Sequence, residues 1–162
     1  MHIRPLRRDD LPHLVELTID TFGPFYEDSF RPHVGDIVFV HEHGSWRDDY
    51  RRQVPALHHP GQGKHVAVAE AHPGHPVVGY VAWNVDPARK HGEIEILAVA
   101  AGHRRGGAGS ALCDHALGAM RADGVEVVAI GTGGDPFHAP ARGLYESLGF
   151  TPFPGVYYYK AL

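Results

Sequence analysis

Apolar and polar positions separate this chain into helix-like and strand-like segments. Between Leu11 and Phe22, apolar residues recur every three or four positions, which is the period of a helix with one buried face. Segments such as 77–85 are short, rich in β-branched and aromatic residues, and bounded by Pro or Gly, which is typical of strands. We predict helices at 9–22, 45–54, 108–122 and 138–148, and strands at 2–6, 65–69, 77–85, 93–99, 125–130 and 156–160.

The order of these segments indicates how the strands pair. Three strands between 65 and 99 follow one another through short connections, which favours an antiparallel meander. The strands at 93–99 and 125–130 are separated by a helix, and such a crossover makes them parallel. We therefore expect an α/β fold with one mixed, mostly antiparallel sheet and helices on both faces. At 162 residues, the chain is expected to form a single domain over 1–162.

Composition narrows the class of protein. The net charge is −4 and the basic residues form no cluster, so nucleic acid is not the expected partner. No apolar run approaches the roughly 18 residues of a membrane span, and the first residues lack a signal peptide's apolar core. The chain has one cysteine, Cys113, which suits a reducing compartment. We expect a cytoplasmic protein that does not bind membranes.

Histidine is unusually frequent, with 14 residues. Groups such as His41-Glu42-His43 and His58-His59 raise the question of a metal site. None of them has the spacing that fixes ligand geometry in known zinc motifs. We therefore expect no metal.

One stretch, residues 94–112, carries the main chemical signal. An apolar strand leads into the loop Arg104-Arg105-Gly106-Gly107-Ala108-Gly109 and then into a helix. Glycines let the backbone approach a ligand closely. The first amides of a helix have no acceptor within it, and the helix dipole adds partial positive charge there. With two arginines beside it, this loop is a candidate site for a diphosphate.

The loop resembles the R/Q-x-x-G-x-G/A signature of the GNAT family of N-acetyltransferases. A second segment, Leu144-Tyr145-Glu146-Ser147-Leu148-Gly149-Phe150, is similar to that family's second signature. The two occur in the family's order and in its strand–helix context, and the resemblance covers roughly 64–150. It implies a sheet of about six or seven strands, in which the parallel pair splays apart at the cofactor site.

The resemblance also implies that acetyl-CoA is the co-substrate. Backbone amides of 105–110 would hold its pyrophosphate, and the strand end would pair with the pantetheine arm as an added strand. The Val99 amide is the implied donor to the thioester carbonyl. His138 stands where the family often has an Asn that contacts the cofactor. The implied cofactor residues are Leu97, Ala98, Val99, Arg104, Arg105, Gly106, Gly107, Ala108, Gly109, Ser110 and His138.

Three residues are candidates for catalysis. Tyr145 resembles the family's general acid, which protonates the sulfur of coenzyme A. Glu93 and Glu95 are two apart on one strand, so they are expected to share a face. Either is a candidate base, with a water relay for Glu93, and His138 is an alternative base because imidazole titrates near neutrality.

The acceptor substrate is harder to predict from the sequence. We expect a small-molecule primary amine, since no peptide-binding signature is present, and direct transfer in a ternary complex. The family's acceptor pocket implies roles for Phe25, Tyr26, Trp46 and Tyr50, although the same aromatics also suit core packing. A homodimer is a possibility that the resemblance favours slightly.

Three alternatives remain to be weighed. The acceptor could be a protein N-terminus or lysine. The chain could instead be an acyl-CoA-binding regulatory module without turnover, although such a module needs neither Tyr145 nor Glu93. A dinucleotide-dependent oxidoreductase is disfavoured, because the glycine loop follows a meander and no GxGxxG opens a first βαβ unit.

Overall fold

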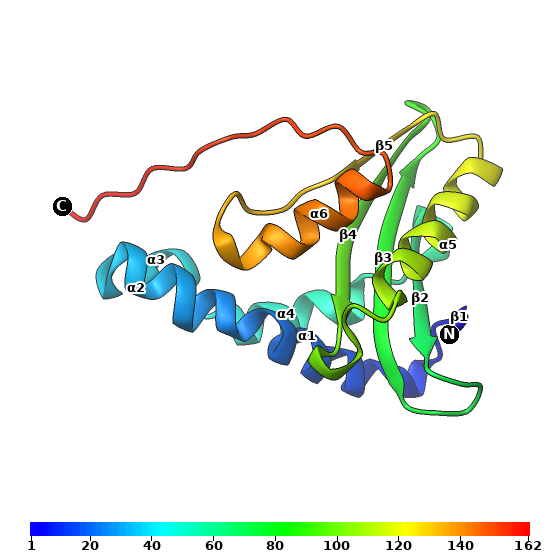
Figure 1. Ribbon diagram of the computed structural model, residues 1–162, viewed down its shortest axis with the longest axis horizontal. Helices are drawn as coiled ribbons and strands as arrows, with labels where there is room; N and C mark the ends of the chain where they lie inside the picture. The colour runs from blue at the N-terminus through cyan, green and yellow to red at the C-terminus, as the bar shows by residue number, and fades with distance from the viewer.

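A five-stranded sheet forms the centre of the protein. The computed structural model describes residues 1–162, and Figure 1 shows helices on both sides of the sheet. Strands β1 to β4 are antiparallel neighbours in chain order, and β5 lies parallel to β4. The predicted mixed α/β sheet is therefore confirmed. The strands are β1 (His2–Pro5), β2 (Lys64–Glu70), β3 (Val77–Asp86), β4 (His91–Val99) and β5 (Val127–Ile130).

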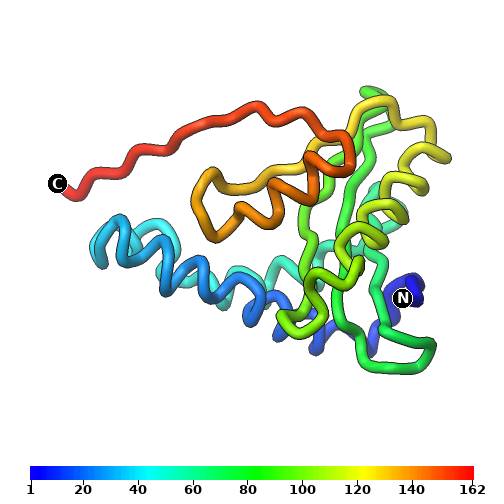
Figure 2. The backbone as a smooth tube through the Cα atoms, in the orientation of Figure 1, coloured from blue at the N-terminus to red at the C-terminus, as the bar shows by residue number.

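The expected six or seven strands were too many, because the predicted strand at 156–160 does not form. Residues 151–162 are exposed and have no regular secondary structure, and Figure 2 shows this end of the chain running away from the sheet. A strand needs a neighbour to satisfy its backbone groups. Pro152 and Pro154 lack the amide that such pairing requires, and no pairing partner lies beside this segment in the structure.

The first helix continues beyond its predicted end at Phe22. It passes through Pro24 into a six-residue π-helical segment, Phe25–Phe30, and then into α2. A proline has no amide to bond the preceding turn, and a wider π turn is one way in which a helix absorbs that loss. The helices are α1 (Leu11–Pro24), α2 (Arg31–Val34), α3 (Asp36–His43), α4 (Trp46–Ala56), α5 (Ala108–Ala122) and α6 (Ala139–Ser147). None of them is long and apolar enough to cross a bilayer.

Each face of the sheet has its own apolar core. On one face, residues such as Val68 and Tyr80 pack against α1 and the end of α4. On the other face, residues such as Val81 and Trp83 pack against α5. The strands therefore read as continuous apolar runs, because both of their faces are covered.

Strand β4 has two irregularities near the functional site. The register with β3 shifts so that Ala82 faces Ile96 while Trp83 faces Ile94, which leaves Glu95 as an extra residue. The parallel pairing with β5 begins at His91 and ends at Ile94. Strand β4 therefore continues to Val99 with no neighbour on its β5 side, which is the splayed pair that the family resemblance implies.

A buried hydrogen bond joins α1 to the sheet and provides a test of this packing. The Thr18 hydroxyl donates to the Leu14 carbonyl at 2.6 Å, and the Tyr80 hydroxyl donates to Thr18 Oγ1 at 2.6 Å. Both side chains have 0% exposure. Burial raises the pKa of Tyr80, so its hydroxyl stays protonated.

We expect Thr18→Val to lower the free energy of unfolding by about 1–3 kcal/mol, because the Tyr80 hydroxyl would be buried without a partner. The double variant Thr18→Val/Tyr80→Phe removes both groups and should recover much of that loss. Urea unfolding of the two single variants and the double variant measures the coupling. Additive losses would contradict the hydrogen bond.

Candidate active site

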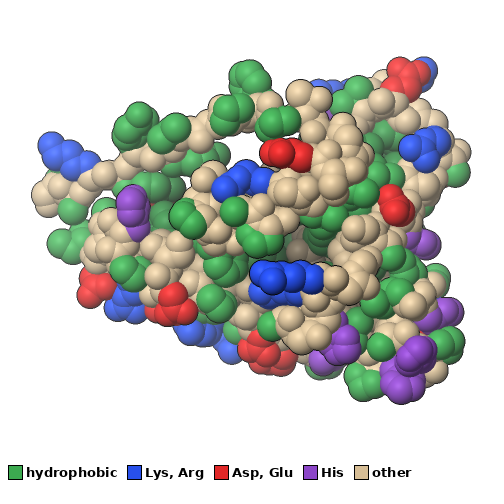
Figure 3. All heavy atoms as spheres, viewed as in Figure 1, with side chains coloured by type: hydrophobic (Ala, Val, Ile, Leu, Met, Phe, Trp, Pro, Cys, Tyr) green, Lys and Arg blue, Asp and Glu red, His purple; other side chains and the backbone are tan.

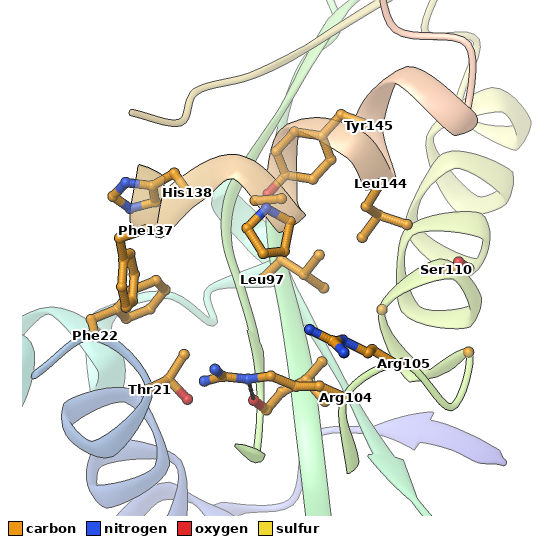
Figure 4. Close-up of a pocket in the computed structure, with 15 residues that line it drawn as sticks. Thr21, Phe22, Leu97, Arg104, Arg105, Ser110, Phe137, His138, Leu144 and Tyr145 are labelled. Carbon is orange, nitrogen blue, oxygen red and sulfur yellow. Dashed lines mark hydrogen bonds between the residues drawn. The ribbon is translucent and has the colours of Figure 1, made fainter. Parts of the chain in front are cut away.

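A cavity of about 540 Å³ opens where β4 and β5 separate. Its walls come from the end of α1, the end of β4, the 104–110 loop and α6. Figure 3 shows a hollow bordered by basic and hydrophobic side chains, and Figure 4 shows the basic pair of the loop across from α6. The lining consists of Thr21, Phe22, Leu97, Val99, Arg104, Arg105, Gly107, Gly109, Ser110, Phe137, His138, Pro140, Ala141, Leu144 and Tyr145.

The 104–110 loop has the geometry of an anion site. Arg105 and Gly107 have φ angles of 60° and 83°, and this left-handed pair turns the chain into α5. None of the amides from 105 to 110 donates to an acceptor within the protein. Arg104 Nε donates to the Val99 carbonyl at 3.0 Å, which fixes the loop against the end of β4. The loop therefore offers free amides and two guanidinium groups to a phosphate.

The end of β4 offers a free strand edge beside this loop. The Ala100 amide donates to the Val78 carbonyl at 2.8 Å. Backbone groups alternate in direction along a strand, so the Val99 amide points to the opposite edge, where β5 has already ended. Leu97 and Val99 both line the cavity. An extended ligand could pair with this edge as a strand would.

Tyr145 reaches from α6 into the cavity (Figure 4). Its hydroxyl makes no hydrogen bond to the protein. Burial, together with the nearby Cys113, raises the pKa of Tyr145 to about 12. The phenol is therefore protonated and can donate at any pH below about 11.

His138 has a partner that the sequence analysis did not identify. Its ring Nδ1 lies 2.6 Å from Asp135 Oδ2, and its backbone amide donates to Asp135 Oδ1 at 3.3 Å. An Asp followed three residues later by a His at a helix start was the signal available in the sequence, since an Asp there caps the helix.

The two glutamates lie outside this cavity. Glu93 is exposed, and its side chain forms no hydrogen bond within the protein. Glu95, at the register shift, accepts a hydrogen bond from Asn84 Nδ2 at 2.8 Å. Neither carboxylate lines the cavity that Tyr145 lines, and the role of the two glutamates as bases remains a prediction.

The predicted acceptor aromatics form a cluster next to the cavity and do not line it. Tyr26 stacks on Trp46 with ring centroids 4.7 Å apart, and its hydroxyl lies 3.1 Å from that of Tyr50. Trp46 is only 2% exposed. Phe25 reaches furthest, because its ring contacts that of His138 at 4.8 Å. The structure therefore shows mainly packing roles for this group.

Ala98, Gly106 and Ala108 also do not line the cavity, although their neighbours in sequence do. Ala98 and Ala108 are buried at 0% and 1% exposure, so only their backbones could take part. Phe22 also lines the cavity, and the residues that the sequence analysis missed are Thr21, Phe137, Pro140, Ala141 and Leu144. Leu144 stood beside Tyr145 in the second signature, whereas the others depend on how α1 and α6 meet. No three His, Cys, Asp or Glu side chains gather closely enough to hold a metal ion.

The site's combination of a splayed strand pair, an amide-rich loop and a tyrosine can be compared with known families. The model of the acetyltransferase (GNAT) family matches residues 17–150. The chain belongs to this family. GNAT members are acetyltransferases, and the match includes both sequence signatures as well as the second half of α1.

Similar proteins include one curated relative and many solved GNAT-like structures. A mycothiol acetyltransferase from Beutenbergia cavernae is 44% identical over 70 residues, which is 43% of this chain. The aligned part spans only 23% of that relative's length. A BH1408 protein from Bacillus halodurans has a TM-score of 0.74 at 18% identity, with 100% of both chains covered. The enzyme AAC(6')-Iy, bound to a coenzyme A–acetylneamine bisubstrate analogue, has a TM-score of 0.67 at 14% identity and covers 99% of this chain and 97% of its own.

The one cysteine of this GNAT domain lies against the site but is predicted to be unreactive. Cys113 is 0% exposed, and burial raises the pKa of its thiol to about 12. At pH 8, only roughly one molecule in ten thousand would carry the thiolate that reacts. We expect no labelling of native protein by Ellman's reagent over minutes and one thiol per chain in guanidinium. Rapid labelling of native protein would contradict this burial.

Proposed function

We propose that this protein transfers the acetyl group of acetyl-CoA to a primary amine of a small molecule, directly within a ternary complex. The proposal rests on one observation, which is that three features line the same cavity. These are the free amides of the 104–110 loop, the unpaired edge of β4 at Val99, and the Tyr145 hydroxyl. Together they match the phosphate, the extended arm and the reactive sulfur of one elongated ligand.

Each feature would have one task. The amides of 105–110 and the guanidinium of Arg105 would bind the diphosphate. The Val99 amide would stabilise negative charge on the thioester oxygen during attack. Tyr145 would donate its proton to the leaving thiolate, and its raised pKa means that the phenol still carries that proton when the thiolate leaves.

The choice of a small-molecule amine is supported by the relatives. One relative's name is mycothiol acetyltransferase, and the AAC(6')-Iy structure holds a coenzyme A–acetylneamine analogue. Both names describe acceptors of small size. The cavity of about 540 Å³ is also in the range of small-ligand sites.

The loop can be tested separately from the chemistry. Gly107→Ala places a side chain at a φ of 83°, which costs roughly 1–2 kcal/mol in the native loop geometry. We expect titration calorimetry with acetyl-CoA to show roughly 5–30-fold weaker binding. The matched control is Gly102→Ala, three residues beyond β4, where φ is ordinary and a Cβ meets nothing within 4 Å. Absence of acetyl-CoA binding by the wild type at millimolar concentration would refute the proposed function.

Tyr145→Phe separates an enzyme from a binding module. We expect kcat to fall by about 10²–10⁴-fold, because general acid catalysis has that range, while the dissociation constant for acetyl-CoA stays within about twofold. Thiol release is measured with Ellman's reagent, and the buried Cys113 should add no background. Because the pKa of Tyr145 is raised to about 12, the wild type should show no loss of kcat from Tyr145 ionisation up to about pH 10. An unchanged kcat in Tyr145→Phe would exclude this acid.

A further inference from the structure

The His138 ring is held as an oriented base at one end of the cavity. Its Nδ1 lies 2.6 Å from Asp135 Oδ2. Partial burial alone would raise the pKa of Asp135, but hydrogen bonding and charge from His138 outweigh it, and that pKa is lowered. Asp135 is thus a carboxylate that can only accept a hydrogen bond, so Nδ1 carries the hydrogen. In the neutral imidazole, the lone pair is then on Nε2, and this nitrogen has no partner in the protein.

The residues around Asp135 and His138 allow these two side chains to lie close together. A Cβ on Gly133 would collide with Asp135 Oδ2 and lie 2.6 Å from His138 Nδ1, so only glycine fits there. Arg142 Nη1 donates to the carbonyls of Gly133 and Asp135 at 2.6 and 2.8 Å. The loop that carries Asp135 is therefore fixed to α6, the same helix that carries Tyr145.

Two phenylalanine rings contact the imidazole. The ring of Phe25, from the π-helical segment, lies 4.8 Å from that of His138, and the ring of Phe137 lies 4.9 Å away. In Figure 4, His138 lies with Phe137 and Phe22 at the end of the cavity away from Ser110. This end is therefore separate from the proposed phosphate loop.

The charged groups on the segments around His138 come from four places in the chain. Asp135 is the only ionised side chain that contacts the ring. Arg142 is occupied by backbone carbonyls, and Arg104 and Arg105 lie on the far wall of the cavity (Figure 4). On the π-helical segment, Glu27 is occupied by Trp46, Arg31 and Arg47, and Asp28 is exposed. A cationic amine at this end would therefore meet one uncommitted ring nitrogen.

We propose that His138 is the base that deprotonates the acceptor amine, with Asp135 as its positioning residue. This inference rests on the proposed function. The ammonium group gives one proton to Nε2, and the amine nitrogen bonds to the thioester carbon as the carbon–sulfur bond breaks. Tyr145 protonates the sulfur, and the second proton lost from nitrogen restores the phenol through solvent. The imidazolium releases its proton to water, so one amide, one thiol and one proton are formed.

The pH dependence of two variants tests the base. We expect His138→Gln to lower kcat/KM about a hundredfold at pH 7, with the deficit shrinking as the pH rises toward the acceptor's own pKa, because the amine then arrives already deprotonated. The wild type should have an acid limb that this variant lacks. Rates are measured by thiol release with neamine, phenethylamine and spermidine as probes. A merely structural loss would be the same at every pH.

Asp135→Asn tests the positioning role. The asparagine oxygen can still cap the helix, but its amide group turned toward Nδ1 would favour the tautomer with the hydrogen on Nε2. We expect a loss similar to that of His138→Gln, with an unchanged dissociation constant for acetyl-CoA. Nitrogen-15 shifts of His138 should report Nδ1–H in the wild type and Nε2–H in Asp135→Asn. The same Nε2–H tautomer in the wild type would overturn the proposal without any assay of turnover.

Controls distinguish this inference from the proposed function. His72→Gln and Asp9→Asn remove the same groups from exposed positions and should leave rates unchanged. Wild-type turnover combined with normal rates in both test variants would overturn the His138 base while leaving the acetyltransferase intact. A wild type that binds no acetyl-CoA would overturn both. Gly133→Ala should reproduce the Asp135→Asn pH profile, because its Cβ displaces the pair.

Discussion

Strand β4 loses its parallel neighbour halfway along its length, and the rest of the site depends on this separation. Pairing with β5 ends at Ile94, whereas β4 continues to Val99. An unpaired strand edge inside a protein is costly unless water or a ligand satisfies it. Here the edge opens into the cavity, where water or a ligand can reach its backbone groups. The loop that follows is fixed to that edge by the bond from Arg104 to the Val99 carbonyl.

The sheet order and the anion loop could be predicted because they depend on local signals. The helix between 93–99 and 125–130 is a crossover, which makes the two strands parallel. The arginines and glycines of the 104–109 loop are neighbours in sequence, so they predict an anion site without any information about distant residues. The strand at 156–160 was wrong for the opposite reason. Its aromatic and β-branched composition is typical of strands, but a strand also needs a neighbour, and composition gives no information about one. The local signal against a strand there was the presence of Pro152 and Pro154.

The side of the sheet to which each β4 side chain points could not be predicted either. Spacing by two places residues on one face only while the register is unbroken. At the shift around Glu95, Ile94 packs in the core beside α5 and Ile96 in the core beside α1, although they are two apart. A bulge reorients side chains without leaving a mark in hydropathy. The expectation that Glu93 and Glu95 share a face, which rests on their spacing, therefore fails to account for the register shift that lies between them.

The Asp135–His138 pair shows how a short segment can combine structure and chemistry. The same carboxylate caps the 3-10 turn Pro136–His138, which leads directly into α6, through one oxygen and binds the imidazole through the other. The cap fixes the helix that carries Tyr145, so one residue relates the positions of both candidate proton-transfer groups. Because Gly133 alone permits this approach, the loop tolerates little variation. Gly133 therefore acts by lacking a side chain, which lets two polar side chains pair close to the backbone.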